Sequence, residues 1–431
     1  MIDLNFALLL LALTPLGAAA APVQSLPKNA SATSLVIARA NVLSEDGTRW
    51  LANTDVVMED GRIRAIGQDA EIPDGAVQIE GEGLWLTPGL IDLHSHLVLY
   101  PYDERSWNDQ VLKESIELRT IRGVGSAGVS LRRGWTTLRE LGTEGAGFAD
   151  VALRDAIDQG LIQGPRILAV TRALVATGCY GPSGFAPNWD LPKGAQVADG
   201  PVGVRVAVRE QIAAGADWIK VYADYRRKPG DPSTPTFSQE ELNAICDEAR
   251  SAGVSVSAHA VTAEAIRRAV LAGVATIEHG YEADATVLEL MAKHGVALCP
   301  TLAANEAMCR YQGWEPGQPE PQRLTRARSM FKAALAAGVT IACGSDVGVF
   351  AHGQNAREIE LMVEYGMTPG AALASATSVA AKVIDRPGLG RIAVGNEADL
   401  VLFGGDPLVD PSALWKVHAV ISRGVEVDLN R

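Results

Sequence analysis

The chain has 431 residues, of which 47% are hydrophobic and 21% are charged. This length and composition suit one large globular domain, or a large domain with a smaller one beside it. The formal net charge of −13 argues against a nucleic-acid partner, because no dense Lys/Arg cluster is available to neutralise phosphates. The five cysteines are scattered without CxxC spacing, so neither a zinc knuckle nor a disulfide framework is expected.

The chain starts with MIDLNFALLLLALTPLGAAAAP, an apolar run followed by small residues. This pattern predicts a secretory signal peptide over 1–21, although Asp3 precedes the apolar run and no basic residue does. The run is too short and too soon interrupted for a membrane span. We therefore expect a periplasmic or secreted protein with no membrane partner. A disordered or misassigned start is the alternative.

Two segments, 33–87 and 385–431, have the pattern of short β-strands. The first alternates apolar and polar residues in SLVIARANVLS, TDVVMEDGRIRAIG and AVQIEGEGLWLTPG, with Gly and Asp-Gly turns between them. The end of the chain repeats this pattern in ADLVLFGGDP and VHAVISRGVEVDL. Because both ends differ from the middle in the same way, we predict that they build one small β domain together.

Residues 88–384 alternate short apolar runs with Ala-rich amphipathic stretches. The predicted strands are LIDLHSH, TTLREL, RILAVTR, WIKVYA, SVSAHA, TIEHG, ALCPTL and IACGSD. Helix candidates such as SQEELNAICDEARSAG and TAEAIRRAVLAG end at Gly, which is typical of a helix C-cap. Eight such units predict an α/β fold, a closed (β/α)8 TIM barrel. An open doubly wound sheet is the alternative, but its glycine-rich phosphate turn is absent after the first strand.

Chemically active residues stand at the ends of these predicted strands. His94 and His96 close the first run, His259 the fifth, His279 the sixth and Asp346 the eighth. The carboxyl ends of barrel strands carry the chemistry, so this placement predicts a functional site. Because side chains alternate along a strand, His94 and His96 both face the barrel interior. The two imidazoles can therefore bind the same metal ion.

Lys220 lies near the end of the fourth run, and the same alternation places Trp218, Lys220 and Tyr222 inside the barrel. A lone cation in a barrel interior is costly. Its charge can be balanced by an ion pair with Asp346, or removed if the amine reacts with CO2 to give a carbamate. A carbamate is an anionic ligand with two oxygens, which can bridge two metal ions.

On the carbamate assumption, the donors divide into two metal sites. His94, His96 and Asp346 with one carbamate oxygen form the first, and His259 and His279 with the other oxygen form the second. Imidazole and carboxylate ligands suit zinc. Two ions about 3.5 to 4 Å apart would lower the pKa of a bridging water and polarise a carbonyl, which predicts metal-assisted hydrolysis. Asp346 is the predicted catalytic residue, which moves the proton from the attacking water to the leaving group.

Taken together, GLIDLHSH, GADWIK, SAHA, IEHG and GSD resemble the amidohydrolase superfamily, and the resemblance covers essentially the whole chain after the leader. GNEADLVLFGGDPL resembles part of the small β-sandwich-like domain of these enzymes. TTLRELG, GPRILA, TGCYG and HGQNAREIELMVEYGMTP resemble the imidazolonepropionase-related branch, which includes Xaa-Pro dipeptidases and hydrolases of acylated amino acids. The resemblance implies two zinc ions bridged by carbamylated Lys220, with His94, His96, His259, His279 and Asp346 as the other ligands.

The resemblance also separates subtypes. Lys220 favours the binuclear, amide-cleaving members, because deaminases and imidazolonepropionase-like members generally use one metal ion and need no lysine here. Many relatives have a histidine in the loop after the third strand, where this chain has Tyr180, and that position is implied in holding a substrate carboxylate. The usual dipeptide or Xaa-Pro specificity therefore cannot be assumed. Tyr180, Tyr222 and His352 are the predicted substrate contacts, with a packing role as the alternative for each.

We predict a binuclear zinc hydrolase that cleaves an amide bond in a dipeptide or an N-acyl amino acid with a free carboxylate. One alternative is a hydrolase of a cyclic amide, a lactone or another ester on the same metal centre. The other is a non-catalytic binding protein on the same scaffold, which missing ligands would indicate, and none is missing. The expected partners are a small-molecule substrate and further copies of the chain, although no motif defines an interface.

Overall fold

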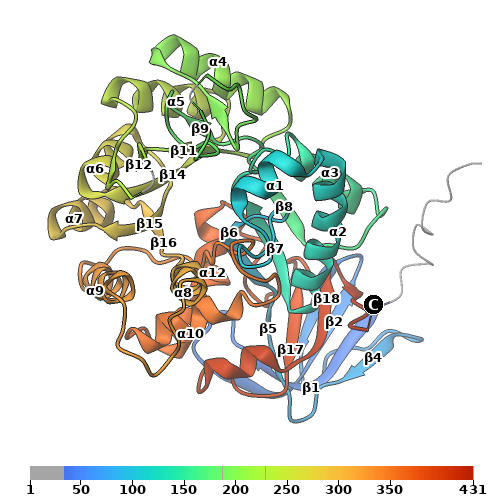
Figure 1. Cartoon of the computed structure of the whole chain (residues 1–431). Helices are drawn as coiled ribbons and strands as arrows, with labels where there is room; N and C mark the ends of the chain where they lie inside the picture. Colours follow the sequence, from blue (N-terminus) through green and yellow to red (C-terminus); the bar gives the residue numbers. More distant parts are fainter. Residues whose placement is uncertain (1–33, 187, 229, 431) are drawn as a thin grey trace, which may run out of the picture.

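The computed structural model describes residues 34–186, 188–228 and 230–430 (Figure 1). The predicted signal peptide over 1–21 lies outside these residues. In the described part of the chain, no helix combines the length and the apolar character needed to cross a lipid bilayer.

Strands from both ends of the chain form one eight-stranded sheet, which we call the terminal sheet. Its order is β19-β18-β17-β5-β1-β2-β3, and β4 pairs with β1. In Figure 1 the red C-terminal strands β17 and β18 lie beside the blue N-terminal strands. The strands are β1 (Leu35–Leu43), β2 (Trp50–Glu59), β3 (Arg62–Gly67), β4 (Val77–Glu80), β5 (Trp85–Pro88), β17 (Leu400–Phe403), β18 (Val417–Ser422) and β19 (Val425–Glu426).

The two ends of the chain meet where β17 pairs antiparallel with β5, with Leu402 opposite Leu86. Apolar side chains from both ends, including Ile37, Leu86 and Leu402, are buried in one core. The predicted strands at the two ends are therefore confirmed. The sandwich-like shape and the domain boundaries, 33–87 with 385–431 and 88–384, stay predictions.

The middle of the chain forms parallel strands with helices around them, an α/β TIM-barrel-like arrangement (Figure 1). One sheet has the order β6-β7-β8 and the other the order β10-β9-β11-β14-β15-β16, and β12 and β13 form a hairpin. The strands are β6 (Leu90–Ser95), β7 (Trp135–Glu140), β8 (Arg166–Ala169), β9 (Leu174–Val175), β10 (Gln196–Val197), β11 (Trp218–Tyr222), β12 (Asp224–Arg226), β13 (Ser233–Pro235), β14 (Ser255–Thr262), β15 (Thr276–Glu282) and β16 (Ala297–Cys299).

The predicted eighth strand, IACGSD, is not a regular strand, because this segment makes only isolated bridges to its neighbours. We call residues 341–347 the closing segment. On one side, the Leu93 N–H of β6 donates to the Cys343 carbonyl oxygen at 2.8 Å. On the other side, the Ala342 N–H donates to the Leu298 carbonyl oxygen of β16 at 2.9 Å. The closing segment thus lies between β16 and β6, where an eighth strand would lie.

Local sequence signals set the ends of the helices. Ser238 and Glu241 form a capping box at the start of α5, and Gly273 ends α6 in the left-handed conformation with φ 97°. The helices are α1 (Trp107–Lys113), α2 (Ile116–Arg132), α3 (Ala149–Asp158), α4 (Gly200–Ala213), α5 (Gln239–Ser251), α6 (Ala263–Ala272), α7 (Ala285–His294), α8 (Leu302–Tyr311), α9 (Gln322–Ala336), α10 (Ala356–Glu364), α11 (Pro369–Ser375), α12 (Ser378–Val383) and the 3₁₀ helix η1 (Pro411–Trp415).

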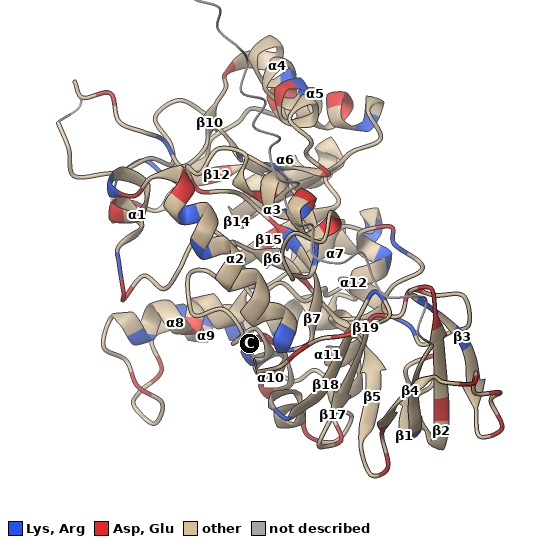
Figure 2. Cartoon of the chain, turned by 90° about the vertical axis from the view of Figure 1, so that its right-hand side faces the viewer, with Lys and Arg blue, Asp and Glu red and all other residues tan. Residues whose placement is uncertain are grey.

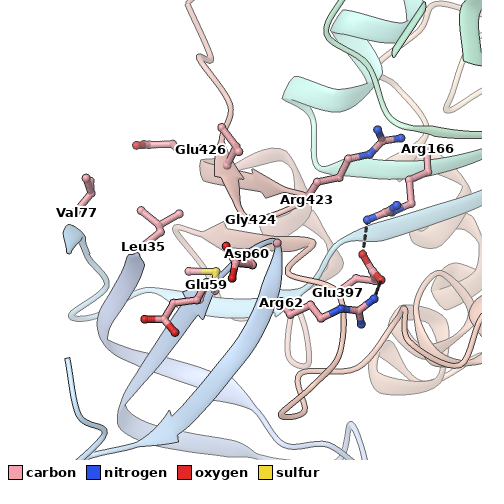
Figure 3. A pocket seen from close by; sticks show the side chains of 13 residues that line it. Leu35, Glu59, Asp60, Arg62, Val77, Arg166, Glu397, Arg423, Gly424 and Glu426 are labelled. Carbon is pink, nitrogen blue, oxygen red and sulfur yellow. Dashed lines mark hydrogen bonds and ion pairs between the residues drawn. The ribbon is translucent and has the colours of Figure 1, made fainter. Parts of the chain in front are cut away.

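Ion pairs join β8 to the segment that leads into strand β17 of the terminal sheet. Arg166 of β8 donates through Nη2 to Glu397 Oε2 at 2.7 Å and through Nε to Asp399 Oδ2 at 2.9 Å. A cavity of about 740 Å³ lies beside these residues and is also lined by Arg62 and Arg423 (Figure 3). None of the predicted metal ligands lines it.

Acidic and basic positions are spread over the chain, as Figure 2 shows.

Candidate metal centre

Three predicted ligands meet where β6 ends beside the closing segment. The Nε2 atoms of His94 and His96 lie 3.5 and 3.3 Å from the same oxygen of Asp346, Oδ1. His94 and His96 are 2% and 4% exposed. Their common contact with Asp346 shows that both imidazoles face the same side, as the strand alternation predicts. They converge on one small buried volume lined by nitrogen and oxygen donors.

The two predicted histidines of β14 and β15 adjoin this group. The rings of His259 and His279 have centroids 4.5 Å apart, and the His279 ring lies 5.1 Å from that of His94. One donor atom from each of His94, His279 and Asp346 lies within 4.8 Å of the others, a spacing that suits a shared metal ion. The His259 Nε2 atom lies 3.6 Å from Asp224 Oδ1.

Lys220 of β11 completes the set. Its side chain is 1% exposed, and its Nζ has no hydrogen-bond partner among the described residues. The ion pair with Asp346, the alternative considered above, is therefore not made. Burial lowers the pKa of the Lys220 amine to about 8, because the charged form is desolvated there. A buried amine without a partner, among imidazole and carboxylate donors, fits a lysine that carries a metal-bridging carbamate.

Three of the histidines are held through Nδ1, which leaves Nε2 free for a metal ion. His94 Nδ1 lies 2.7 Å from Glu278 Oε2, His96 Nδ1 lies 2.9 Å from the Gly142 carbonyl oxygen, and His279 Nδ1 lies 2.7 Å from Thr301 Oγ1. Acceptors at one ring nitrogen fix the tautomer and orient the other nitrogen. The arrangement matches the way proteins orient metal-binding histidines.

Glu278 is a candidate functional residue that the sequence analysis missed. It is fully buried and accepts hydrogen bonds from Arg139 Nη2 at 2.9 Å and from Ser257 Oγ at 2.7 Å, in addition to its contact with His94. Burial opposes its ionisation, but the charges of Arg139 and Lys220 outweigh that effect and hold the pKa of the Glu278 carboxyl below its usual range. The sequence signal was its place directly before His279, in the IEHG motif.

Asp92 is a second missed residue, and it ties β6 to the closing segment. Its carboxylate accepts the backbone N–H groups of His94 and Ser345, both at 3.0 Å, and the Asn355 side-chain amide at 2.7 Å. Asp92 is itself buried. Because His94 is a predicted ligand and Ser345 directly precedes another, Asp346, this carboxylate sets the relative position of the two ligands.

Two of the predicted ligands have unusual backbone conformations. His279 has φ 74° and Asp346 has φ 63°, in the left-handed region that non-glycine residues rarely adopt. Such strain collects at functional sites, where the surrounding structure holds it in place. At His279 it also explains why two successive residues, Glu278 and His279, both approach the metal-ligand cluster although strand neighbours normally point apart.

Two of the predicted substrate contacts, Tyr180 and Tyr222, lie together beside the cluster. The Tyr222 ring stacks on the His259 imidazole at a centroid distance of 4.6 Å, and the Tyr180 ring lies 4.2 Å from Tyr222. The Tyr180 hydroxyl donates to Glu144. A cavity of about 320 Å³ is lined by Trp107, Tyr180 and Tyr225, among other residues. Their role in substrate binding stays a prediction.

His352, the third predicted substrate contact, is turned toward the backbone. Its Nε2 lies 3.0 Å from the Leu99 carbonyl oxygen, so the ring nitrogen donates to the segment that follows β6. Its Nδ1 is buried without a hydrogen-bond partner in the described part of the chain. This placement supports the alternative that His352 packs the loop behind His96, while contact with a substrate stays a prediction.

An α/β barrel-like fold that gathers histidines, a carboxylate and a buried lysine at its strand ends is the scaffold of a metal-dependent enzyme. Comparison with protein families agrees with this class: the model of the amidohydrolase family matches residues 85–427. The chain belongs to the amidohydrolase family, which is metal-dependent. The family expectation from the sequence motifs is confirmed.

The chain is also similar to individual proteins. It is 32% identical to ochratoxinase from Aspergillus niger over 78% of this chain and 73% of that protein. A crystal structure of a prolidase complexed with N-methylphosphonate-L-proline shares 34% identity with a TM-score of 0.80, covering 92% of this chain and all of that chain. A Xaa-Pro dipeptidase with bound methionine in the active site shares 31% identity with a TM-score of 0.82, covering 91% and 99%.

Proposed function

We propose that this protein is a binuclear zinc amidohydrolase that cleaves the amide bond of a dipeptide or an N-acyl amino acid with a free carboxylate. The observation that carries the proposal is the buried Nζ of Lys220, which has no hydrogen-bond partner among the described residues and interacts electrostatically with His94, His259, His279 and Asp346. The similarity to a prolidase and a Xaa-Pro dipeptidase supports amide bonds as the target.

In this proposal, the neutral Lys220 amine adds to CO2, a bond forms between Nζ and carbon, and one proton is released. His94, His96 and Asp346 would hold the first ion and His259 and His279 the second, with the carbamylated Lys220 as the ligand that both sets share. The lowered pKa of the Lys220 amine supports this step, because only the neutral amine is nucleophilic. Nitrogen and oxygen ligands of this kind suit zinc.

When bound, the metal ions lower the pKa of a water molecule and polarise the scissile carbonyl. Asp346 accepts the proton of the attacking water and delivers it to the amide nitrogen, which leaves as an amine. Burial opposes ionisation of Asp346, but the His94 and His96 imidazoles beside it outweigh burial and hold the pKa of this carboxyl below its usual range. Asp346 therefore starts the reaction as the carboxylate that this role requires.

The surroundings of the cluster support a substrate that enters past the aromatic side chains. Tyr222 stacks on one face of His259, and Tyr180 contacts Tyr222 and also lines the cavity of about 320 Å³. Arg226 and Arg227 also line that cavity, and their guanidinium groups suit a substrate carboxylate. We assign Tyr180 and Tyr222 to the wall of the substrate site.

We also infer that the barrel closes through the closing segment, with its hydrogen bonds to β16 and β6 as the support.

The predicted signal peptide over 1–21 is the basis for proposing a periplasmic or secreted location.

Metal analysis tests the proposed centre. Protein purified without chelator is expected to carry about two zinc ions per chain, and Lys220→Ala is expected to lose metal and amide hydrolysis. Lys332→Ala changes an exposed lysine of α9 and is the matched control. One metal ion or none in the wild-type protein, unchanged by Lys220→Ala, contradicts the binuclear centre. Full turnover by Lys220→Ala without an added small carboxylic acid contradicts the carbamate.

A further inference from the structure

Glu144 is a buried carboxylate beside the metal centre that the proposed mechanism does not use. It follows β7 and is 1% exposed. Its Oε2 accepts two hydrogen bonds, from the Tyr180 hydroxyl and from Trp107 Nε1, the latter at 2.8 Å. Its Oε1 is buried and has no hydrogen-bond partner among the described residues. One oxygen of this carboxylate is therefore fully engaged and the other is left available.

The loop that carries Glu144 is held firmly in place. Arg119 of α2 donates through Nη1 to the Glu144 carbonyl oxygen at 2.7 Å and through Nη2 to the Thr143 carbonyl oxygen at 3.1 Å. Its Nε donates to the Val98 carbonyl oxygen. The guanidinium thus supplies positive charge nearby but directs these N–H groups to the backbone. Glu144 also has φ 50°, a strained conformation that this network maintains.

The available oxygen lies near one predicted metal ligand, His96. A methyl group built on Gly142 would lie 3.4 Å from Glu144 Oε1 and 3.9 Å from His96 Cε1. The oxygen and the imidazole therefore border the same small volume. His96 itself offers no hydrogen to Glu144, since its Nδ1 is engaged with the Gly142 carbonyl oxygen and its Nε2 faces Asp346.

We propose that Glu144 Oε1 binds the free α-ammonium group of the substrate, so that the enzyme prefers dipeptides with a free amino terminus to N-acyl amino acids. This inference rests on the proposed amide hydrolysis and narrows its substrate class. An ammonium group has three N–H donors and a positive charge, which complement a buried carboxylate oxygen without a partner. In a dipeptide, that group is separated from the scissile carbonyl by a single carbon, which places it beside the His96 side of the centre.

The test compares pairs of substrates that differ only in the ammonium group: alanyl and propionyl derivatives of proline, leucine and phenylalanine. Wild-type enzyme is expected to show a kcat/KM about 10- to 100-fold higher for the alanyl member of a pair. Glu144→Gln is expected to lose about that factor on alanyl substrates and to change less than about 3-fold on propionyl substrates. Zinc content of the variant should equal that of wild type.

Tyr180→Phe is the second variant, because it removes one hydrogen bond to Glu144 and keeps the carboxylate. It is expected to retain the preference for alanyl substrates. If Glu144→Gln instead lowers kcat/KM equally for both members of each pair, or loses zinc, Glu144 supports the site structurally and the inference is wrong. A wild-type preference for propionyl substrates contradicts it as well.

Calorimetric binding of ketomethylene analogues of the alanyl and propionyl pairs separates this inference from the proposed function. These analogues lack the scissile C–N bond, so their binding does not depend on turnover. Tighter binding of the alanyl analogue that is lost in Glu144→Gln supports the ammonium site even if no amide is cleaved, in which case the proposed function alone fails. Equal binding of the two analogues to wild-type enzyme overturns the ammonium site.

Discussion

His94 Nδ1 lies 2.7 Å from Glu278 Oε2, so an imidazole at the end of β6 is oriented by a carboxylate from β15, 184 residues later in the chain. Glu278 directly precedes His279, a predicted ligand of the second metal ion. One buried carboxylate thereby links the two halves of the proposed metal centre. Arg139 of β7 holds the other oxygen of that carboxylate at 2.9 Å.

Loss of the Glu278 carboxylate is expected to weaken metal binding without removing a ligand. Glu278→Gln should raise the zinc dissociation constant about 10- to 100-fold, because a neutral amide oxygen accepts the His94 Nδ1–H more weakly than the carboxylate does. Competition with a chelator, followed by metal analysis, measures this change. Glu282→Gln, at an exposed position at the end of the same strand, is the control and should leave zinc affinity unchanged. Wild-type affinity in Glu278→Gln would show that this contact does not orient the ligand.

Gly348 is expected to be required for the position of His96. Its φ is 111°, and a Cβ there would lie 2.5 Å from the His96 carbonyl oxygen and 2.9 Å from the His96 Cβ. Gly348→Ala should therefore lower both zinc content and stability. Gly366 provides a matched control, since its φ is 113° and a Cβ would meet no atom within 4 Å.

Gly366→Ala should cost about 1 to 2 kcal/mol of backbone strain and leave zinc content unchanged. Chemical denaturation and metal analysis of both variants separate the two effects: Gly366→Ala introduces backbone strain alone, and Gly348→Ala introduces backbone strain together with a steric clash against His96. Equal losses of stability and equal zinc content in both variants would contradict a specific role for the contact with His96.

The unfolding free energy is expected to depend on pH through His352. Burial lowers the pKa of the His352 imidazole to about 4, from an ordinary value of 6.5. Between these values the unfolded chain binds a proton that the folded protein excludes, so stability falls as the pH falls from about 6.5 to about 4. His352→Gln should remove up to about 3 kcal/mol of this decline.

Denaturation of the zinc-loaded proteins at a series of pH values measures this difference. The unfolding free energy of the wild type minus that of His352→Gln should be constant above about pH 7. This difference should decrease as the pH falls toward 4. His418→Gln, at an exposed position in β18, should reproduce the wild-type pH profile. Parallel profiles for wild type and His352→Gln would mean that His352 is not held neutral by burial.

The Arg166 ion pairs are expected to stabilise the fold without affecting catalysis. Arg166→Met should lower the unfolding free energy by about 1 to 3 kcal/mol, because Asp399, which is 5% exposed, would lose the guanidinium and keep the hydrogen bond from the Arg423 backbone N–H. Arg64→Met removes a more exposed ion pair with Glu59 and should cost less than about 1 kcal/mol. Denaturation measures both, and kcat/KM should be unchanged. A larger loss in Arg64→Met would contradict the role of burial.

Several features of the fold and the site could be predicted from local sequence. The alternation in LIDLHSH is sufficient to place His94 and His96 on one side of a strand, and their common contact with Asp346 agrees with it. Most of the predicted strands are confirmed, because each needs only a short apolar run with turn residues around it. The eighth predicted strand, IACGSD, is not a regular strand. Its segment is joined to β16 and β6 by isolated backbone hydrogen bonds, which no local sequence pattern specifies.

The sequence by itself determined the family, most of the strands and the set of candidate metal ligands, since these depend on residue type and on periods of a few positions. Only the tertiary structure decided which side chains orient them and which atoms stay unpaired. Glu278 reaches His94, and Glu144 keeps a buried oxygen without a partner among the described residues, because strands far apart in the chain pack together. Whether a buried polar atom has a partner depends on that packing, and residue type alone does not reveal it.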